Sequence, residues 1–576
     1  MEGDRLAILI CHCNGEIDNG IEVSELLEFS KSLPGVVKEH EYLCGREGLE
    51  FARDFLKESE ANKLVLVGCS PRTHRGIFLR ALSEFKGLII EHANIREQCA
   101  WAHEDRRRAT EKAKVLVRMA VQRVLELEPL EKINVAITPS ALVIGGGVAG
   151  MQASLDIASR GFKVFLLERS RELGGRVARL SSTFPTIGCG ICCMHNCPNC
   201  ELTPKIEEIS AAENIEVLTP AEVVGAKGHL GNYKVKVKVG EGGMEEEKEL
   251  NVGTVIIATG SKTFDPKRIP EYGYEFEDVI TAEELERIYL EERLKGGDKL
   301  VRASDGQIPK CVNFIQCVGS RGLKPESNPY CSITCCLYAM GHARKIKELY
   351  PDAEVYIHYA DLRSPYRGFE EYYNAALDSG VKFVRGLVER VEKRGEKLVV
   401  VYENAELRKM DEMETELVVL SVGQEPSENT AKLSEIFHVG RDIDGFFMEL
   451  NPRFLVEEVT GVYVAGGAVG PRNIRYAVAD GRAAAENAIR LMECGFFEKE
   501  GVVPEMDEEK CIKCATCFEI CPFGAIELTK EREMRVVEEA CWSCGICAAE
   551  CPARALNLKH YKDEEIFTEL NACLSF

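Results

Sequence analysis

The chain has 576 residues, of which 45% are hydrophobic and 29% charged, and its formal net charge is −22. This length is enough for three to four domains with large cores. The acidic balance argues against a nucleic-acid partner because phosphate contacts need a basic surface, so we expect a solvated acidic surface or docking of basic proteins.

The amino-terminal segment lacks the basic region and apolar core of a secretory signal. No stretch of the chain reaches the roughly 18 consecutive apolar residues that a membrane-spanning helix needs. We therefore expect a cytoplasmic protein without a membrane span.

The chain contains 25 cysteines, most of them in four groups at 11–99, 189–200, 311–336 and 511–551. So many cysteines in a cytosolic protein indicate metal binding or redox chemistry rather than disulfides. Their regular short spacings favour iron–sulfur ligation.

The first 130 residues are expected to form a small α/β domain with strands at 6–10, 63–68 and 87–92. Its cysteines follow strand ends, and parallel strands bring their carboxyl ends to one edge of a sheet. We therefore predict an iron–sulfur cluster in this domain, with inert buried cysteines as the alternative. The candidate ligands are Cys11, Cys13, Cys44, Cys69 and Cys99. Which of the first two binds stays open.

Residues 140–168 have the pattern of a strand, a glycine turn, a helix and a second strand. In the turn, Gly145 and Gly147 allow the backbone to approach a pyrophosphate, and Gly150 allows the helix to pack on the strand. The helix amino terminus favours the phosphates. Glu168, at the end of the second strand, is positioned to accept a hydrogen bond from a ribose hydroxyl. This unit predicts dinucleotide binding.

Two later segments indicate FAD rather than NAD. Residues 255–261 form an apolar strand that ends in Thr-Gly, and residues 461–488 are similar to the closing flavin segment of the thioredoxin and glutathione reductase superfamily. There a helix amino terminus, here at Asn473 and Ile474, would stabilise negative charge on a reduced flavin. Gly467 stands where that superfamily usually has an aspartate. The predicted FAD contacts are Gly145, Gly147, Gly150, Glu168, Arg169, Gly175, Arg176, Thr259, Gly260, Gly466, Gly467, Asn473 and Ile474.

Between the flavin segments, residues 183–205 hold five cysteines within twelve residues. Three interpretations stay open: a further cluster, a redox-active thiol pair, or a zinc or structural site. The candidate metal ligands here are Cys189, Cys193, Cys197 and Cys200.

A second dinucleotide fold is predicted from a strand at 312–318, a helix at about 333–349 and a strand at 354–360. It lacks the glycine turn that would seat a nicotinamide dinucleotide, and cysteines occupy that region instead. We predict a cluster site there, with buried structural cysteines as the alternative. The candidate ligands are Cys317, Cys331, Cys335 and Cys336.

Near the carboxyl end, two cysteine runs repeat the spacing C-x2-C-x2-C-x3-C-P. This is the spacing of a ferredoxin with two [4Fe–4S] clusters, in which the fourth cysteine of each run binds the other cluster. A pair of zinc sites is the alternative. One predicted ligand set is Cys511, Cys514, Cys517 and Cys551, and the other is Cys541, Cys544, Cys547 and Cys521.

Several specific segments carry a family resemblance. They are VGCSPRTHR (67–75), EHANIREQCAWAH (91–103), FPTIGC (184–189), LTPK (202–205), QCVGSRG (316–322), NPYCSITCC (328–336) and GAVGPRNI (467–474). Together they resemble the A subunit of heterodisulfide reductases over essentially the full chain. Many members carry a ferredoxin module inserted after the segment equivalent to 232–239, where this chain has only GEGGMEEEKEL (240–250). The chain is therefore identified as similar to a short form of that family.

The resemblance implies an oxidoreductase subunit whose flavin splits electron pairs. In that scheme a hydrogenase or formate dehydrogenase partner reduces FAD. One electron then passes to ferredoxin and the other to the B and C subunits, which reduce the heterodisulfide of coenzymes M and B in methanogenesis. The disulfide chemistry lies on those partners, so no catalytic residue is assigned to this chain, and a homodimer within a larger complex is expected.

Two alternatives remain open. One is a relay protein that does not split electrons, as in quinone-interacting oxidoreductases or tungsten-dependent benzoyl-CoA reductases. The other is an NAD(P)H–disulfide reductase, against which the missing nicotinamide glycines count. The expected cofactors are FAD and [4Fe–4S] clusters: two in the ferredoxin, four with the groups at 11–99 and 317–336, and five if the run at 189–200 also binds one.

The predicted fold class is a multidomain α/β protein. It has a thioredoxin reductase-like core of two dinucleotide folds, an amino-terminal α/β domain and a carboxy-terminal α+β ferredoxin domain. The predicted ranges are 1–130 for the amino-terminal domain, 131–305 and 401–498 for the FAD domain, 306–400 for the second dinucleotide fold, 503–560 for the ferredoxin and 561–576 for a tail.

Overall fold

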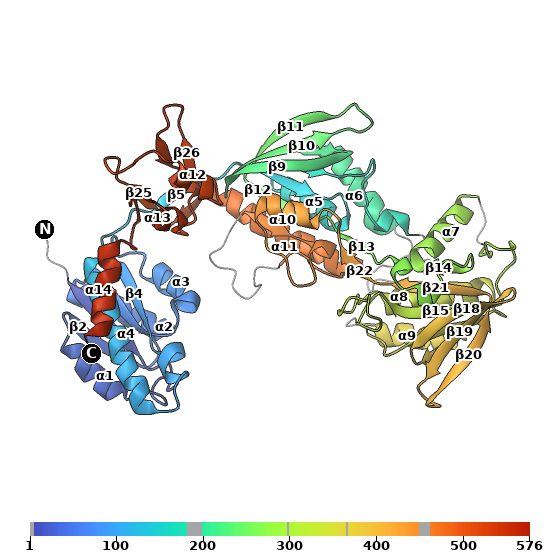
Figure 1. Cartoon of the computed structure of the whole chain (residues 1–576), viewed down its shortest axis with the longest axis horizontal. Helices are drawn as coiled ribbons and strands as arrows, with labels where there is room; N and C mark the ends of the chain where they lie inside the picture. The colour runs from blue at the N-terminus through green and yellow to red at the C-terminus, as the bar shows by residue number, and fades with distance from the viewer. Residues whose placement is uncertain (1–4, 181–198, 296–298, 364–366, 449–460, 576) are drawn as a thin grey trace. The chain divides into compact units, whose positions relative to one another are not determined.

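The structure of the protein is a computed structural model that describes residues 5–180, 199–295, 299–363, 367–448 and 461–575. The chain divides into two compact units, Met1–Val135 with Glu498–Phe576, and Ala136–Phe497. Figure 1 labels many of the elements of both units, which are described separately. None of the helices in the described ranges is long and apolar enough to cross a membrane.

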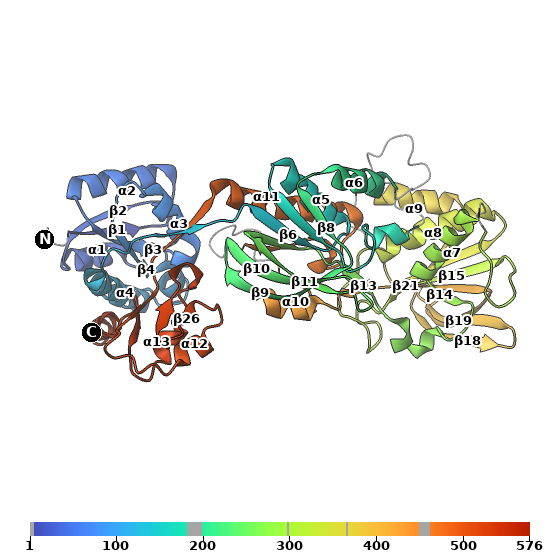
Figure 2. The ribbon, with the colours of Figure 1, turned by 90° about the horizontal axis from the view of Figure 1, so that it is seen from above.

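The first unit begins with a parallel four-stranded sheet of order β2-β1-β3-β4. Its strands are β1 (Leu6–Cys11), β2 (Val36–His40), β3 (Lys63–Gly68) and β4 (Ile89–Asn94). Its helices are α1 (Val23–Lys31), α2 (Arg46–Ser59), α3 (Pro71–Ala81) and α4 (Arg106–Glu126). The two central strands are buried along their whole length, as expected of a parallel sheet covered on both faces. Figure 2 shows α2 and α4 on opposite sides of it.

The same unit contains a small α+β domain. Its strands pair antiparallel as β25 (Pro504–Met506) with β28 (Leu556–Leu558) and β26 (Ile526–Leu528) with β27 (Met534–Val536). Its short helices are α12 (Thr516–Ile520) and α13 (Ile546–Ala549). The predicted tail forms a helix, α14 (Asp563–Leu574), which lies beside α4 (Figure 1). Arg123 of α4 donates a hydrogen bond to the carbonyl of His560 at 3.2 Å and pairs with Glu569 at 3.2 Å, which fixes the tail against the first sheet domain.

The second unit contains two parallel five-stranded sheets. The first, β23-β12-β6-β7-β8, has its first strand in the centre, the arrangement of a dinucleotide fold. Its strands are β6 (Ser140–Ile144), β7 (Lys163–Leu167), β8 (Ile215–Leu218), β12 (Thr254–Ile257) and β23 (Val462–Val464). The helices of this domain are α5 (Val148–Ser159), α6 (Asn199–Ala211), α10 (Thr430–Phe437) and α11 (Ile474–Cys494), and α11 packs on α5. An antiparallel meander of β9 (Ala221–His229), β10 (Asn232–Val239) and β11 (Glu246–Val252) completes it.

The second sheet has the order β14-β21-β15-β16-β17. Its strands are β14 (Val279–Thr281), β15 (Cys311–Val318), β16 (Glu354–Tyr359), β17 (Lys382–Arg385) and β21 (Leu417–Val422). Its helices are α7 (Ala282–Leu294), α8 (Cys335–Leu349) and α9 (Phe369–Asp378). The meander here is β18 (Val388–Arg394), β19 (Lys397–Asn404) and β20 (Lys409–Thr415). Two strands of this sheet, β14 and β21, lie outside the predicted range 306–400, so this fold is larger than the sequence pattern indicated.

Candidate redox sites

The glycine turn after β6 combines two packing constraints with one open face. An ideal Cβ on Gly145 would lie 2.4 Å from the carbonyl oxygen of Ala258, and one on Gly150 would lie 1.9 Å from the carbonyl oxygen of Gly145. Gly147, the N-cap of α5, has no atom within 4 Å of such a Cβ. The first and third glycines therefore allow the backbone to pack, whereas the second faces open space at a helix amino terminus, which fits a phosphate group.

Glu168 lies directly after β7 and its carboxylate is held beside this turn. One carboxylate oxygen accepts from the backbone N–H of Gly146 at 2.8 Å, and the other accepts from the N–H and hydroxyl of Ser170, each at 2.8 Å. The side chain is buried. Its position is that of the acidic residue which binds ribose in this fold.

A second part of the predicted flavin site lies where β12 ends and α11 begins. The hydroxyl oxygen of Thr259 is buried and has no hydrogen-bond partner among the described residues, and the left-handed Gly260 beside it faces open space. Asn473 caps α11 by accepting from the N–H of Tyr476 at 2.9 Å. An unsatisfied buried hydroxyl is costly, so a polar ligand at this point fits the structure.

The other predicted flavin contacts differ in their surroundings. Arg176 donates to the hydroxyl of Ser261 at 3.4 Å, while Arg169 is exposed and lies 3.6 Å from Glu428. Gly175 and Gly466 both have positive φ, at 55° and 66°. A Cβ on Gly467 would lie 3.1 Å from the backbone nitrogen of Ser261, so this position leaves little room for a side chain without some adjustment.

In the first sheet, four of the five predicted cysteines gather at its carboxyl edge. The sulfur of Cys11 accepts from the N–H of Cys13 at 3.3 Å and from that of Leu43 at 3.4 Å. Burial raises the pKa of Cys69 to about 12, and the neighbouring thiols Cys44, Cys11 and Cys13 contribute to the rise. Deprotonating these thiols without a compensating cation is costly, and a metal cluster would supply that positive charge.

Cys99, the fifth candidate ligand, follows β4. It lies in the π-helical turn Arg96–Ala100 and is fully buried, which raises its pKa to about 11, and the charge that acts on it is that of Lys112. Sequence reasoning missed Arg96, which donates to the sulfur of Cys13 at 2.9 Å. The one sequence feature that could have indicated a role for Arg96 was its position within the family-like segment 91–103.

The cysteines of the second dinucleotide fold also come together. Cys317 has a positive φ of 62° at the end of β15, and Cys335 is the first residue of α8. Burial raises the pKa of Cys335, and nearby Cys317, Cys336 and Cys331 raise it further. All four lie close enough to interact electrostatically, as the prediction of a shared site requires.

Two further features of this group were not predicted. Arg321 donates a hydrogen bond to Cys317 and forms an ion pair with Asp361. Burial raises the pKa of the Cys317 thiol, and the contact with Arg321 lowers it by a smaller amount. Cys311 lies at the opposite end of β15, half-buried, and donates to the carbonyl of Glu414 at 3.6 Å. Its position separates it from the other cysteines of this part of the chain.

The ferredoxin cysteines form two sets. A cavity is lined by the first predicted set, Cys511, Cys514, Cys517 and Cys551. In the second set, burial raises the pKa of Cys547 to about 11, and Cys541, Cys521 and Cys544 contribute to the rise. In both sets the fourth cysteine of one run therefore lies with the first three of the other.

The remaining predicted ligands are not described in the structure. Cys189, Cys193 and Cys197 lie outside the described residues, and although Cys200 belongs to α6, its side chain is not described. The three interpretations of this run therefore stay open.

Comparisons with known proteins show similarities at the level of domains and of the whole chain. Residues 139–301 match a family model for pyridine nucleotide-disulphide oxidoreductases, and residues 504–558 match a model for 4Fe-4S dicluster domains. The chain is 38% identical to the second iron–sulfur A subunit of the CoB–CoM heterodisulfide reductase of Methanopyrus kandleri, with 92% of each chain covered. It is 38% identical to the A subunit of the H2:CoB–CoM heterodisulfide,ferredoxin reductase of Methanothermobacter thermautotrophicus, covering 100% of this chain and 98% of that one. Among solved structures, Lactococcus lactis thioredoxin reductase matches 62% of this chain and 99% of its own at 18% identity, with a TM-score of 0.42.

Proposed function

Since the chain belongs to the family of heterodisulfide reductase A subunits, we propose that it is the flavin and iron–sulfur subunit of a heterodisulfide reductase complex. The family models support an FAD-binding domain and two [4Fe–4S] clusters in the ferredoxin domain. Two further clusters are part of the proposal, one at the amino-terminal cysteine group and one at Cys317, Cys331, Cys335 and Cys336.

The residues of the chain would hold and tune the flavin. The amino terminus of α5 at Gly147 would bind the pyrophosphate, Glu168 would orient the ribose, and the amino terminus of α11 would face the ring. When bound, FAD exchanges electron pairs with a two-electron donor and single electrons with clusters. The chain itself supplies the spacing of these sites and their electrostatics.

The length of the loop between β15 and α8 is evidence against binding of a nicotinamide dinucleotide in the second dinucleotide fold. In the flavin fold the turn from β6 to α5 spans residues 145–147, whereas β15 ends at Val318 and α8 begins at Cys335. That longer connection holds the cysteine group in place of the short glycine turn that a dinucleotide needs. This observation supports electron exchange with a cluster at a position where related reductases bind NAD(P)H.

We further propose that the flavin splits electron pairs. In this scheme a hydrogenase or formate dehydrogenase type of donor reduces it, ferredoxin takes one electron, and the B and C subunits take the other and reduce the heterodisulfide. The name of the Methanothermobacter relative, which includes both heterodisulfide and ferredoxin, supports this scheme.

A second candidate function is a relay that does not split electrons. One observation favours it: the alignment with the Methanothermobacter relative spans 658 positions and covers the whole 576-residue chain, so that relative carries insertions which this chain lacks. An absent cluster module would remove one branch of the electron path.

Anaerobic purification with metal and flavin analysis tests the cofactor proposal. We expect one FAD and at least about sixteen irons per chain, four for each of four clusters. Eight irons or fewer would confine the clusters to the ferredoxin domain. Identification of co-purifying subunits then separates the two functions: B and C subunits with a donor support the first, and a different terminal oxidoreductase supports the relay.

A further inference from the structure

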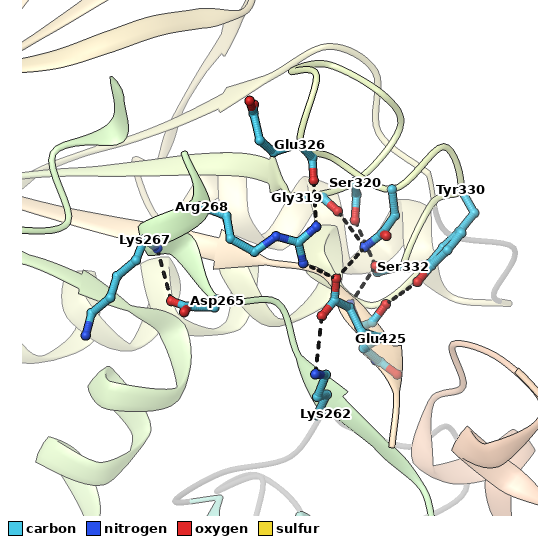
Figure 3. A network of polar contacts seen from close by, with 12 residues as sticks. Lys262, Asp265, Lys267, Arg268, Gly319, Ser320, Glu326, Tyr330, Ser332 and Glu425 are labelled. Atoms are coloured by element: carbon cyan, nitrogen blue, oxygen red, sulfur yellow. Dashed lines mark hydrogen bonds and ion pairs between the residues drawn. The ribbon is translucent and has the colours of Figure 1, made fainter. Parts of the chain in front are cut away.

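Two short antiparallel strands connect the flavin fold with the second dinucleotide fold. They are β13 (Ser261–Thr263) and β22 (Gln424–Pro426), in the register Thr263 to Gln424 and Lys262 to Glu425. Figure 3 shows Glu425 of β22 between Lys262 and Arg268, with Gly319, Ser320 and Ser332 of the loop after β15 nearby. The strands therefore adjoin the loop that carries Cys331.

Gln424 hydrogen-bonds to both β13 and the loop after β15. Only one hydrogen of its side-chain amide is not used in contacts with the described residues. Its side-chain oxygen accepts from the hydroxyl of Ser261 at 3.0 Å, and its side-chain nitrogen donates to the hydroxyl of Thr334 at 2.9 Å. Its backbone N–H donates to the hydroxyl of Ser332 at 2.8 Å, and its carbonyl accepts from the hydroxyl of Tyr330 at 2.9 Å. The residue is buried, so these bonds are shielded from competing water.

One end of this arrangement lies in the predicted flavin site. Ser261 directly follows Gly260 and also accepts from Arg176 at 3.4 Å. A Cβ on Gly467 would lie 3.1 Å from the hydroxyl of Ser261. The Ser261 hydroxyl is thus surrounded by residues that we assign to FAD.

The other end lies in the cysteine group. Thr334 is the N-cap of α8, immediately before Cys335, and Ser332 immediately follows Cys331. The hydroxyls of Ser332 and Ser320 are 2.8 Å apart, which ties the start of the loop to its end. Gly423 must lack a side chain here, because a Cβ would lie 2.4 Å from the Ser320 hydroxyl. Gln424 therefore bonds to neighbours of two of the proposed cluster ligands.

We propose that Gln424 is a positioning residue that holds the Cys331–Cys335 segment in a defined place relative to the flavin site, and so sets electron exchange between the flavin and the cluster. The inference rests on the proposed function, because it requires FAD and a cluster at these sites. The step itself breaks no bond: a reduced flavin loses one electron and an oxidised cluster gains it. Its rate depends on the separation and environment of the two centres, both of which the bridge through Gln424 constrains.

The neighbouring Glu425 has a different role and supplies a matched control. Its carboxylate accepts from Arg268 at 2.6 Å and from Asn328 at 3.1 Å, and Lys262 lies at 3.9 Å. These contacts clamp the junction and include Asn328 of the loop after β15, but Glu425 makes none of the hydrogen bonds to Ser261, Ser332 and Thr334 that Gln424 makes. Glu425→Gln should therefore lower stability but alter hydrogen exchange at 333–336 and the cluster much less than Gln424→Met does.

The test compares Gln424→Met, which keeps the side-chain volume, with Ser261→Ala, Thr334→Val and the control Glu425→Gln in the anaerobically purified full chain. Loss of two hydrogen bonds of about 0.5–1 kcal/mol each should make amide hydrogen exchange at 333–336 about tenfold faster in Gln424→Met. We also expect an altered electron paramagnetic resonance spectrum or midpoint potential of this cluster, and slower reduction of the cluster by photoreduced flavin. Thr334→Val should cause part of these effects, and adding it to Gln424→Met should cause little more.

The outcomes separate the two levels of inference. Wild-type protein with eight irons or fewer would overturn the cluster assignment and this inference together. Wild-type protein with full iron, but with unchanged spectra, potential and electron-transfer rate in Gln424→Met and Thr334→Val, would overturn the role of Gln424 alone. If Gln424→Met loses its cofactors, the milder Ser261→Ala and Thr334→Val variants decide the question by the same readouts.

Discussion

Two glycines of the flavin turn should respond in opposite ways to the same substitution. Gly147→Ala adds a methyl group to open space, whereas Gly150→Ala places one 1.9 Å from the carbonyl oxygen of Gly145. An ordinary contact at this point needs about 3.4 Å, so in the second variant α5 must move by about 1.5 Å from the turn. One variant therefore tests the ligand and the other tests the packing.

The expected magnitudes differ accordingly. Overpacking of this kind costs about 1–3 kcal/mol or more, so Gly150→Ala should lower the melting temperature of the Ala136–Phe497 unit. Gly147→Ala should cost about 1 kcal/mol or less in stability, because it only replaces an N-cap glycine. If the methyl group displaces one charge-assisted hydrogen bond to a phosphate, worth about 1.5–3 kcal/mol, the Kd for FAD should rise about 10- to 100-fold.

The assay is the FAD content of purified protein and the free FAD concentration that restores it, measured beside thermal unfolding. Gly225→Ala is the matched control, because Gly225 also faces open space but lies in β9 away from the turn. An unchanged Kd for FAD in Gly147→Ala would refute the assignment of the pyrophosphate to this open face. A loss of stability as large as that of Gly150→Ala would show that Gly147 is a packing residue instead.

Three other predictions concern the cysteines and the electron donor. Cys551→Ser and Cys521→Ser should each remove about four irons by metal analysis, from opposite clusters, while Cys311→Ser should remove none; equal loss from the third variant would contradict the ligand sets. NADH or NADPH alone should leave the flavin spectrum unchanged in stopped-flow measurements, and stoichiometric bleaching would mean that the second dinucleotide fold still binds nicotinamide. Hydrogen bonding lowers the pKa of Cys514, whereas burial raises the pKa of Cys69 to about 12. In metal-free protein at pH 8, iodoacetamide should therefore modify Cys514 far faster than Cys69. Because only the thiolate reacts, about one Cys69 in 10⁴ is reactive at pH 8 and its rate should rise tenfold per pH unit below that pKa; equal rates by mass spectrometry would contradict the described burial.

Many secondary-structure elements and candidate sites of this protein could be predicted from local sequence patterns. The ferredoxin spacing, the glycine turn and the strands at 6–10, 63–68 and 312–318 each lie within a short segment, and the structure has elements at all of them. Short-range patterns of this kind work because turn geometry, ligand spacing and strand burial depend on neighbouring residues. Family membership followed from several such segments together.

The tertiary structure decided which distant residues meet. It brings Arg96 to the sulfur of Cys13, 83 positions away along the chain. It adds β14 and β21 to the second sheet from outside the predicted range. It also places Gln424 between Ser261 and Thr334, residues that are 163 and 90 positions away along the chain. Such contacts depend on sheet order and strand register across the whole unit, and no local pattern of residues encodes them.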